Sequence, residues 1–550
     1  MSRQLDRRDF LRTSAAAAST LAVSGLSTAQ AAASSRPNIV MVYADDLDFD
    51  EIGAYDHVEY PSWTGARERG LLGENFWGGY RDPRMLTPNI DSLGSEGATF
   101  SRFYITTSIC TPSRYSALTG RFASRSPGFC AKHPPGGPAN IQWNTPVDTR
   151  ETNIARELRK QGYATGVVGK WHSGAPNAIA RGIPADAEYD AKVYGKLHTA
   201  HERGCEHLRD GLGFGFADRI YFSNKEALGL PKWMQVHNLD WITEGALNFI
   251  DRYHRQPFCL YMPLTTPHGS YGAKWIDEDP RITPAGMLKK APDGMPSRQS
   301  IRERLDAEGI DRRNAPATWI DDSVGAVMKR LDDLGVADNT VVIFTSDHQS
   351  RGKYTCYESS RVPCLIRWPR AIAPGTEIDS ICANIDLAAT FIEMAGGSAP
   401  DDMTMDGRSF LPWLTGNATE ADRRDALLLE CSNIRAVVTE QHKFIVNRPG
   451  QEALDRMAAE ATDCARTGER RQIGWDGSRN PHPNEKGIRY GSDRDFPRYF
   501  DIDQLYDLES DIYEQDNVIA DHPAVADRLR ARLTDLLAPL PHTFGEFKTS

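Results

Sequence analysis

The chain has 550 residues, of which 40% are hydrophobic and 25% are charged. This length allows about three or four domains, or two larger ones, and the composition is that of a folded globular protein. Its 64 Lys and Arg stand against 75 Asp and Glu, a net charge of −11. Such a balance argues against a nucleic-acid partner or any other polyanion bound by counterion release. Any anionic ligand must therefore meet a local cationic site.

Residues 1–31 are predicted to be a Tat-type signal peptide. Arg7 and Arg8 precede a stretch rich in Ala and Ser, and Ala29-Gln30-Ala31 has the small-x-small form of a cleavage site. The alternative is a basic disordered tail. A Tat signal implies the Tat export machinery as a partner and a periplasmic or secreted bacterial protein. No later segment reaches the roughly 18–20 consecutive apolar residues of a membrane span, so no stable span is expected.

Four short apolar runs rich in β-branched residues predict strands, and ionisable side chains follow each of them. The runs lie at residues 39–43, 163–168, 258–262 and 341–344, and the side chains after them are Asp45 and Asp46, Lys170 and His172, His268, and Asp347 and His348. Any single one would be read as a solvated loop charge or a helix cap. In open α/β sheets, however, ligands bind at the carboxyl ends of the strands, so all four groups are expected to converge.

Helical patterns fill the gaps between these runs. Ile320, Val324, Val327, Leu331 and Leu334 form one apolar stripe, and a second helix is expected at residues 386–395. Beyond a polar stretch near residue 420 come two short strand patterns and a helix at 525–537. The predicted fold class is α/β, with a large, mostly parallel mixed sheet flanked by helices. A smaller C-terminal α+β domain with a short antiparallel sheet follows, so the expected domains are residues 36–420 and 421–550.

The sharpest local motif is Cys110-Thr111-Pro112-Ser113-Arg114, followed by residues 118–121, Leu-Thr-Gly-Arg. Pro112 suits the first turn of a helix and Gly120 suits its end, which places Cys110 at a helix N-terminus, where an anion is favoured. By itself, such a cysteine is either structural or a thiolate nucleophile with a depressed pKa.

The order of motifs along residues 36–516 resembles that of the type I, formylglycine-dependent sulfatases, in the arylsulfatase-like branch of the alkaline phosphatase superfamily. Besides the Cys110 motif, the matching pieces are Thr87-Pro88-Asn89-Ile90-Asp91, Gly169-Lys170-Trp171-His172, Pro267-His268, Thr345-Ser346-Asp347, Tyr357-Glu358, Asp406-Gly407-Arg408-Ser409 and Leu505-Tyr506-Asp507-Leu508. The resemblance implies an alkaline-phosphatase-like fold, with residues 36–420 as the catalytic domain. It also implies a sulfuric ester hydrolase.

The resemblance further assigns roles to ten residues. Cys110 would be converted by a maturation enzyme to 3-oxoalanine (formylglycine), whose hydrate attacks sulfur. Asp45, Asp46, Asp347 and His348 would hold one divalent cation, most commonly Ca²⁺ in this family. Arg114 would hold the nucleophile, Lys170 and Lys353 would bind sulfate oxygens, His172 would orient or deprotonate the nucleophile, and His268 with Lys353 would protonate the leaving oxygen.

His348 departs from the commonest family pattern, which has Asn as the fourth metal ligand. Imidazole offers nitrogen where calcium prefers oxygen, so the residue at this position does not define which metal is bound. Family members with His here include phosphonate-ester-cleaving enzymes. The alternatives to a sulfatase are therefore a phosphodiester or phosphonate monoester hydrolase and a catalytically silent protein that binds sulfated glycans.

Export and family habit favour a sulfated carbohydrate or polysaccharide as the substrate. Three long connections at residues 60–85, 175–210 and 275–313 are candidates for substrate-contacting loops. Residues 466–498 are rich in Arg and aromatic side chains, among them Arg470 and Arg471. We expect this segment either to contact a sulfated sugar or to be a solvated loop.

Overall fold

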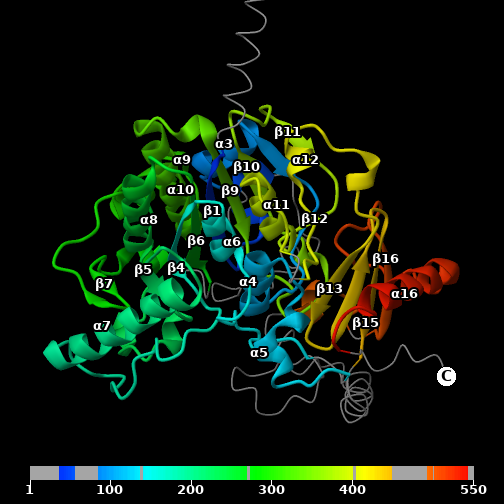
Figure 1. Ribbon diagram of the computed structural model, residues 1–550, viewed down its shortest axis with the longest axis horizontal. Helices are drawn as coiled ribbons and strands as arrows, with labels where there is room; N and C mark the ends of the chain where they lie inside the picture. The colour runs from blue at the N-terminus through cyan, green and yellow to red at the C-terminus, as the bar shows by residue number, and fades with distance from the viewer. Residues whose placement is uncertain are drawn as a thin grey trace, which may run out of the picture.

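The four apolar runs that predicted strands lie next to one another in the central sheet of the computed structural model (Figure 1). They form β1 (Asn38–Asp45), β4 (Ala164–Lys170), β6 (Phe258–Pro267) and β9 (Thr340–Ser346). The structure describes residues 36–55, 84–136, 140–268, 273–400, 404–448, 492–499 and 501–542. Strand β1 pairs in parallel with β6 and with β9, and β6 pairs in parallel with β4. Their carboxyl ends therefore meet at one edge of the sheet, as the sequence predicted.

Four further strands complete an eight-stranded sheet in the order β11-β2-β10-β9-β1-β6-β4-β5. They are β2 (Ala98–Phe100), β5 (Phe216–Tyr221), β10 (Cys364–Arg367) and β11 (Thr376–Ile378). Strand β5 extends the parallel part beyond β4, whereas β10 runs antiparallel to both β9 and β2. The sheet is thus mixed and mostly parallel, which confirms the predicted fold class.

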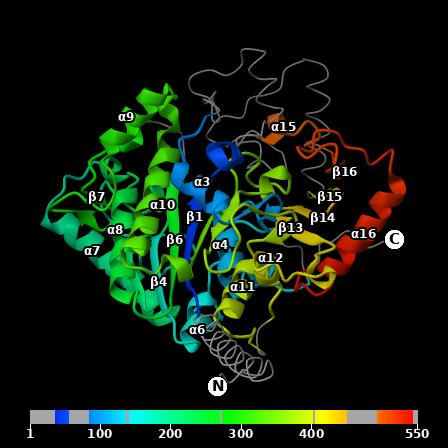
Figure 2. The same cartoon turned by 90° about the horizontal axis from the view of Figure 1, so that it is seen from above.

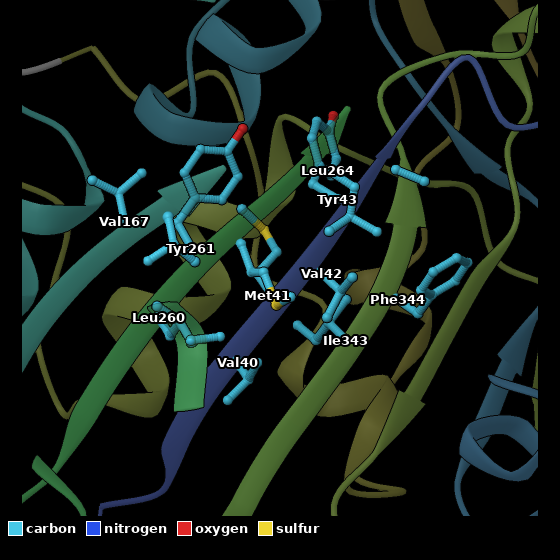
Figure 3. Close-up of a cluster of buried hydrophobic side chains, with 14 of the residues drawn as sticks. Val40, Met41, Val42, Tyr43, Val167, Leu260, Tyr261, Leu264, Ile343 and Phe344 are labelled. Atoms are coloured by element: carbon cyan, nitrogen blue, oxygen red, sulfur yellow. The ribbon is translucent and has the colours of Figure 1, made fainter. Parts of the chain in front are cut away.

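Side chains on both faces of the central strands form the core around this sheet. Figure 3 shows Val40 and Met41 of β1, Leu260 and Tyr261 of β6, and Ile343 of β9 gathered over neighbouring strands. Each of these side chains has no exposed surface. Strands buried on both faces read as continuous apolar runs, which is why these four were recognisable in the sequence.

Helices cover both faces of the sheet. Figure 2 shows α8 and α10 on one side of strands β1, β4 and β6, and α4 and α11 on the other. The first layer consists of α3 (Pro88–Ser95), α8 (Leu239–Tyr253) and α10 (Ala315–Asp333), and the second of α4 (Cys110–Thr119), α6 (Ile154–Lys160) and α11 (Asp386–Met394). Other α-helices, besides one in the C-terminal part described below, are α5 (Pro127–Cys130), α7 (Ala191–Glu206), α9 (Arg298–Glu308), α12 (Leu411–Leu414) and α15 (Ser492–Asp495). The apolar stripe of α10 and the helix expected at 386–395 are both confirmed.

A second, antiparallel sheet of four strands follows the central one in the chain. It comprises β13 (Leu427–Cys431), β14 (Ile434–Val438), β15 (His442–Asn447) and β16 (Asp503–Asp507), with α16 (Pro523–Leu537) packed on one face. On the other face, Leu429 shares a buried cluster with Ile109 and Tyr354. These two residues precede Cys110 and follow Lys353, so the small sheet supports the segments that carry them.

Two minor pairs of strands complete the list of strands. Strand β3 (Phe103–Tyr104) pairs with β12 (Cys382–Ala383), and β7 (Ile282–Thr283) pairs with β8 (Gly286–Met287). Among the described helices, none combines the length and apolar character that a membrane crossing requires.

Candidate active site

The ends of β1 and β9 bring three carboxylates together. Strand β1 ends at Asp45, and Asp347 follows the last residue of β9, its neighbour in the sheet. Side chains in a regular strand alternate between the two faces. Asp46 escapes this alternation because it takes a left-handed backbone conformation, with φ of 64°, and its N–H donates to Asp347 Oδ1 at 3.1 Å. Oxygens of all three carboxylates consequently lie within 4.8 Å of one another.

His348 points its Nε2 atom into this carboxylate cluster. Its Nδ1 lies 2.8 Å from the carbonyl oxygen of Gln349, and because a carbonyl only accepts, Nδ1 carries the proton. In the neutral ring Nε2 then holds a lone pair, 3.1 Å from Asp46 Oδ1 and 3.6 Å from Asp347 Oδ1. Electron-rich atoms at these separations repel one another unless a positive charge, either a proton on Nε2 or a bound cation, lies between them.

Asp45 adds a second indication of a cation. Its Oδ1 is buried and has no hydrogen-bond partner in the described part of the chain, although Arg114 Nη2 lies 3.3 Å away. A buried charged oxygen without such a partner is costly. Three carboxylates with one imidazole nitrogen form a donor set that fits a divalent cation.

Cys110 begins helix α4 beside this donor set. Its Sγ lies 3.3 Å from His348 Nε2, and its exposed fraction is 1%. Burial raises the pKa of the thiol in spite of the nearby Lys353 and Lys170. Burial therefore favours the neutral thiol of an unmodified Cys110 over the thiolate alternative left open by the sequence.

Arg114 lies one turn further along α4 and connects the nucleophile helix to the carboxylates. Its Nη2 and Nε donate to Asp347 Oδ2 at 2.8 and 3.1 Å, and its Nη1 donates to the carbonyl of Lys170 at 3.0 Å. The side chain is fully buried. A planar guanidinium can make these bonds to two elements at once, so Arg114 fixes both Asp347 and the end of β4.

Two lysines are paired with the same carboxylates. Lys170 Nζ bonds to Asp45 Oδ2, and Lys353 Nζ lies 2.9 Å from both oxygens of Asp46. Burial by itself would raise the pKa of Asp45, but Lys170 and other cations hold it well below its usual value. Burial would also raise the pKa of Asp46, but Lys353 and other nearby positive groups lower it below its usual value. Both carboxylates are therefore ionised at neutral pH.

The close approach of β4 to β6 sets the position of Lys170. Gly169 has φ of 100°, and a Cβ atom there would lie 1.9 Å from the carbonyl oxygen of Pro263. Only glycine permits this contact. In the Gly-Lys pair, Gly169 is thus required by the close packing of β4 against β6, and Lys170 supplies the charge that pairs with Asp45.

Both predicted histidines reach the site. His268 follows β6, its Nε2 lies 3.8 Å from Asp46 Oδ2, and 19% of its side chain is exposed. Burial and the charge of Lys170 lower its pKa to about 4. His172 follows β4 with φ of 47°, and its carbonyl accepts from Thr111 Oγ1 at 3.1 Å. Burial, followed by Lys170, holds the pKa of His172 well below its usual value.

The structure thus gathers all ten predicted residues into one site, and it adds others that the sequence did not reveal. A cavity beside the cluster is lined by Asp45, Lys170, Tyr221, Ser223, Asn224, Lys225, His237, Thr265 and His268. Ser223, Asn224 and Lys225 follow β5, which ends at the same sheet edge as β4. The sequence signal was weak because Asp218 and Arg219 interrupt the apolar character of β5.

Several sequence predictions lie outside the described residues. They are the signal peptide at 1–31, nearly all of the connection at 60–85, and most of the basic segment at 466–498, including Arg470 and Arg471. The domain boundary near residue 420 stays a prediction.

The fold and this arrangement of carboxylates, lysines and histidines define a hydrolase of the alkaline phosphatase superfamily. The chain belongs to the sulfatase family, whose model, described as Sulfatase, matches residues 37–397. It is therefore a sulfuric ester hydrolase.

Named relatives agree with this assignment. An N-acetylgalactosamine-6-O-sulfatase of Bacteroides thetaiotaomicron is 25% identical, over 90% of this chain and 92% of the relative. Human arylsulfatase A is 28% identical, over 69% of this chain and 68% of the relative. A solved Bacteroides thetaiotaomicron structure, described under the metabolism of multiple glycosaminoglycans, has a TM-score of 0.58 at 21% identity. The match covers 92% of this chain and 100% of the chain in that structure. This structural likeness concerns the fold alone.

Proposed function

We propose that this protein is an exported sulfatase that removes sulfate from a carbohydrate, using a formylglycine made from Cys110 and one divalent cation. The observation that carries the proposal is the meeting of Cys110 Sγ with His348 Nε2 at 3.3 Å, beside the three carboxylates. The nucleophile position and the donor set for the metal are thus adjacent. Formylglycine, when hydrated, supplies an oxygen nucleophile where the buried cysteine is a neutral thiol.

Asp45, Asp46, Asp347 and His348 would hold the cation, with Ca²⁺ the family's usual choice. The cation, when bound, supplies positive charge to the sulfate oxygens. Without it, Arg114, Lys170 and Lys353 balance the three aspartates, so the formal charge of this group is +3 − 3 = 0. The described side chains therefore neutralise one another and leave the net attraction for an anionic ester to the metal.

Each remaining residue has a task that its contacts support. Arg114 holds Asp347 and lies one turn beyond the nucleophile position on α4. Lys170 and Lys353 direct their ammonium groups toward the carboxylates, from where they can also donate to sulfate oxygens. His172, whose lowered pKa keeps it neutral, is placed to take a proton from the nucleophile. His268 is placed to give one to the leaving oxygen once the negative charge of the bound ester raises its pKa from about 4. These assignments are part of the proposal.

A carbohydrate substrate is supported by the relatives. The bacterial relative is named for N-acetylgalactosamine 6-O-sulfate, and another structure with this fold was solved with its substrate D-glucosamine-2-N,6-O-disulfate, at a TM-score of 0.54. Export to the periplasm or medium is supported by the twin arginines at positions 7 and 8. Under this proposal the Tat machinery and a formylglycine-generating enzyme are the protein partners.

The mass of the tryptic peptide that ends at Arg114 tests the proposal. Protein purified from its native host should carry an aldehyde in place of the Cys110 thiol and should release sulfate from sugar sulfates. The variant Cys110→Ala should fold normally and release none. Fully unmodified Cys110 in an active protein would overturn the mechanism, and preferred turnover of an aryl phosphonate over an aryl sulfate would overturn the assigned ester.

A further inference from the structure

The cavity beside the metal ligands is also lined by polar side chains that no step above uses. Asp45, Lys170 and His268 line one part of this cavity, and Asn224, His237 and Thr265 line another. Since the first group is proposed to handle sulfate and the leaving oxygen, the second group, in the same cavity, is placed to contact what is attached to that oxygen. This second group is called the leaving-group wall below.

Buried polar atoms of the leaving-group wall lack partners. Within the described residues, both ring nitrogens of His237, Oδ1 of Asn224 and Oγ1 of Thr265 are buried without a hydrogen bond. His237 is only 3% exposed and Thr265 only 4%. A buried polar group left unsatisfied costs about 1–3 kcal/mol. Four such atoms around a cavity of about 10 Å³ therefore indicate a polar group the size of a hydroxyl or a water.

The position of His237 is fixed by packing. Its ring lies against that of Trp275, with centroids 4.5 Å apart and planes inclined by 51°. Trp275 is itself buried. The imidazole is therefore held in place by an aromatic contact, which leaves its two nitrogens available to a ligand.

The chemistry of the wall favours hydroxyl groups over a second anion. Burial, followed by the charge of Lys225, holds the pKa of His237 well below its usual value, so the ring is neutral and has one donor and one acceptor. Thr265 can donate and accept, and Asn224 Oδ1 accepts. The nearest cation of this wall, Lys225, is paired with Glu226. Hydroxyls, which also donate and accept, match this set, whereas a carboxylate or sulfate only accepts.

We propose that Asn224, His237 and Thr265 form a specificity site that binds the hydroxyl groups of the alcohol from which sulfate is removed. The inference rests on the proposed function and narrows it to polyhydroxylated leaving groups such as a sugar. A neutral aryl group would leave the same buried atoms unpaired, and this penalty is the source of discrimination.

The test compares His237→Leu with the wild type, both matured to formylglycine. The probes are 4-nitrophenyl sulfate, the best substrate from a panel of galactose, N-acetylgalactosamine and glucosamine sulfates, and the deoxy analogue of that sugar lacking the hydroxyl next to the ester. We expect the ratio of kcat/KM for the sugar sulfate to that for the aryl sulfate to fall about 10- to 100-fold. The deoxy analogue should lose much less, and His237→Gln, which keeps a donor and an acceptor, should recover part of the ratio.

His254→Leu serves as the matched control. His254 lies at the end of α8, bonded to the carbonyl of Asp251, and its loss should not change the ratio. Asn224→Ala and Thr265→Val give the same comparison if His237→Leu does not fold. Equal losses on sugar and aryl sulfates, or an unchanged ratio, would overturn the inference alone. A wild type that releases sulfate from no substrate would overturn the proposed function, and the inference with it.

Discussion

Replacing Arg114 by lysine tests whether the guanidinium orients a metal ligand. Arg114 donates twice to Asp347 and once to the carbonyl of Lys170, and it is fully buried. Lysine keeps the positive charge, so the electrostatics around the cation change little. It lacks the planar fork, however, and its ammonium cannot reach both partners from one position.

The geometry sets the expected magnitude. The variant loses at least one bond to Asp347, of about 1.5–3 kcal/mol for a charged partner, and leaves the buried Lys170 carbonyl unpaired, at about 1–3 kcal/mol. The local loss is then about 2.5–6 kcal/mol. Removing a group that holds a metal ligand typically lowers metal affinity about 10- to 100-fold. We expect a weakening of this size for Ca²⁺, with a loss of at least tenfold in kcat/KM for 4-nitrophenyl sulfate.

Calcium titration of the metal-free protein, followed by calorimetry, measures this affinity directly and independently of turnover. The control is Arg125→Lys, since Arg125 also pairs through its guanidinium with a carboxylate, Asp406, but belongs to no part of the site. That variant should bind calcium like the wild type. If Arg114→Lys binds calcium and turns over substrate normally, then the bonds to Asp347 do not orient it, and the role assigned to Arg114 is wrong.

Three further outcomes are expected, two from the active-site contacts and one from Asp321, a buried residue of α10 that accepts hydrogen bonds from Asn89 and Ile90 of α3. Chelation of divalent cations should abolish sulfate release and lower the melting temperature, with both restored by Ca²⁺, because a cation that binds only the folded protein stabilises it; an unaffected chelated enzyme would contradict the metal site. Lys353→Met should lower kcat about 10²- to 10⁴-fold for sugar sulfates but much less for 4-nitrophenyl sulfate, whose leaving group needs no proton; equal losses would remove Lys353 from proton transfer. Burial raises the pKa of the Asp321 carboxyl from 3.8 to about 7. The unfolding free energy that its protonated form contributes is therefore fully present below pH 4 and is lost as pH rises through 7. Relative to Asp321→Asn, the wild type should therefore lose up to about 4 kcal/mol of unfolding free energy between pH 4 and 8, measured by urea denaturation; a constant difference across this range would contradict the shift.

The buried strands were predictable from the sequence because burial on both faces leaves an uninterrupted apolar run. Strands β1, β4, β6 and β9 all have this character. Strand β5 was missed because it lies at the sheet edge, where Asp218 and Arg219 are tolerated. The polar residues that follow it were missed for the same reason, and with them one wall of the active-site cavity.

The position of Lys353 in the site could not be predicted from local sequence patterns. It lies in a polar loop after β9, and no periodicity relates it to Asp46, 307 positions earlier in the chain. Its place was inferred only from the spacing that similar sulfatases share. Asp46 is a related case, since a residue type does not reveal that its backbone will adopt a left-handed conformation.

The sequence by itself determined the family, the sheet and the residue types at the ends of its strands, because these depend on apolar runs and short motifs that are local in the chain. Only the tertiary structure decided how those residues face one another. The direction of His348 Nε2, the pairing of each lysine with one aspartate and the unpartnered atoms of the leaving-group wall depend on the register of parallel strands. The net charge of −11 illustrates the difference. A sum over the chain excluded a general polyanion binder, but only the fold reveals that three cations and three carboxylates meet in one neutral cluster. Under the proposed function, a metal bound to this cluster would add the charge that attracts one small anion.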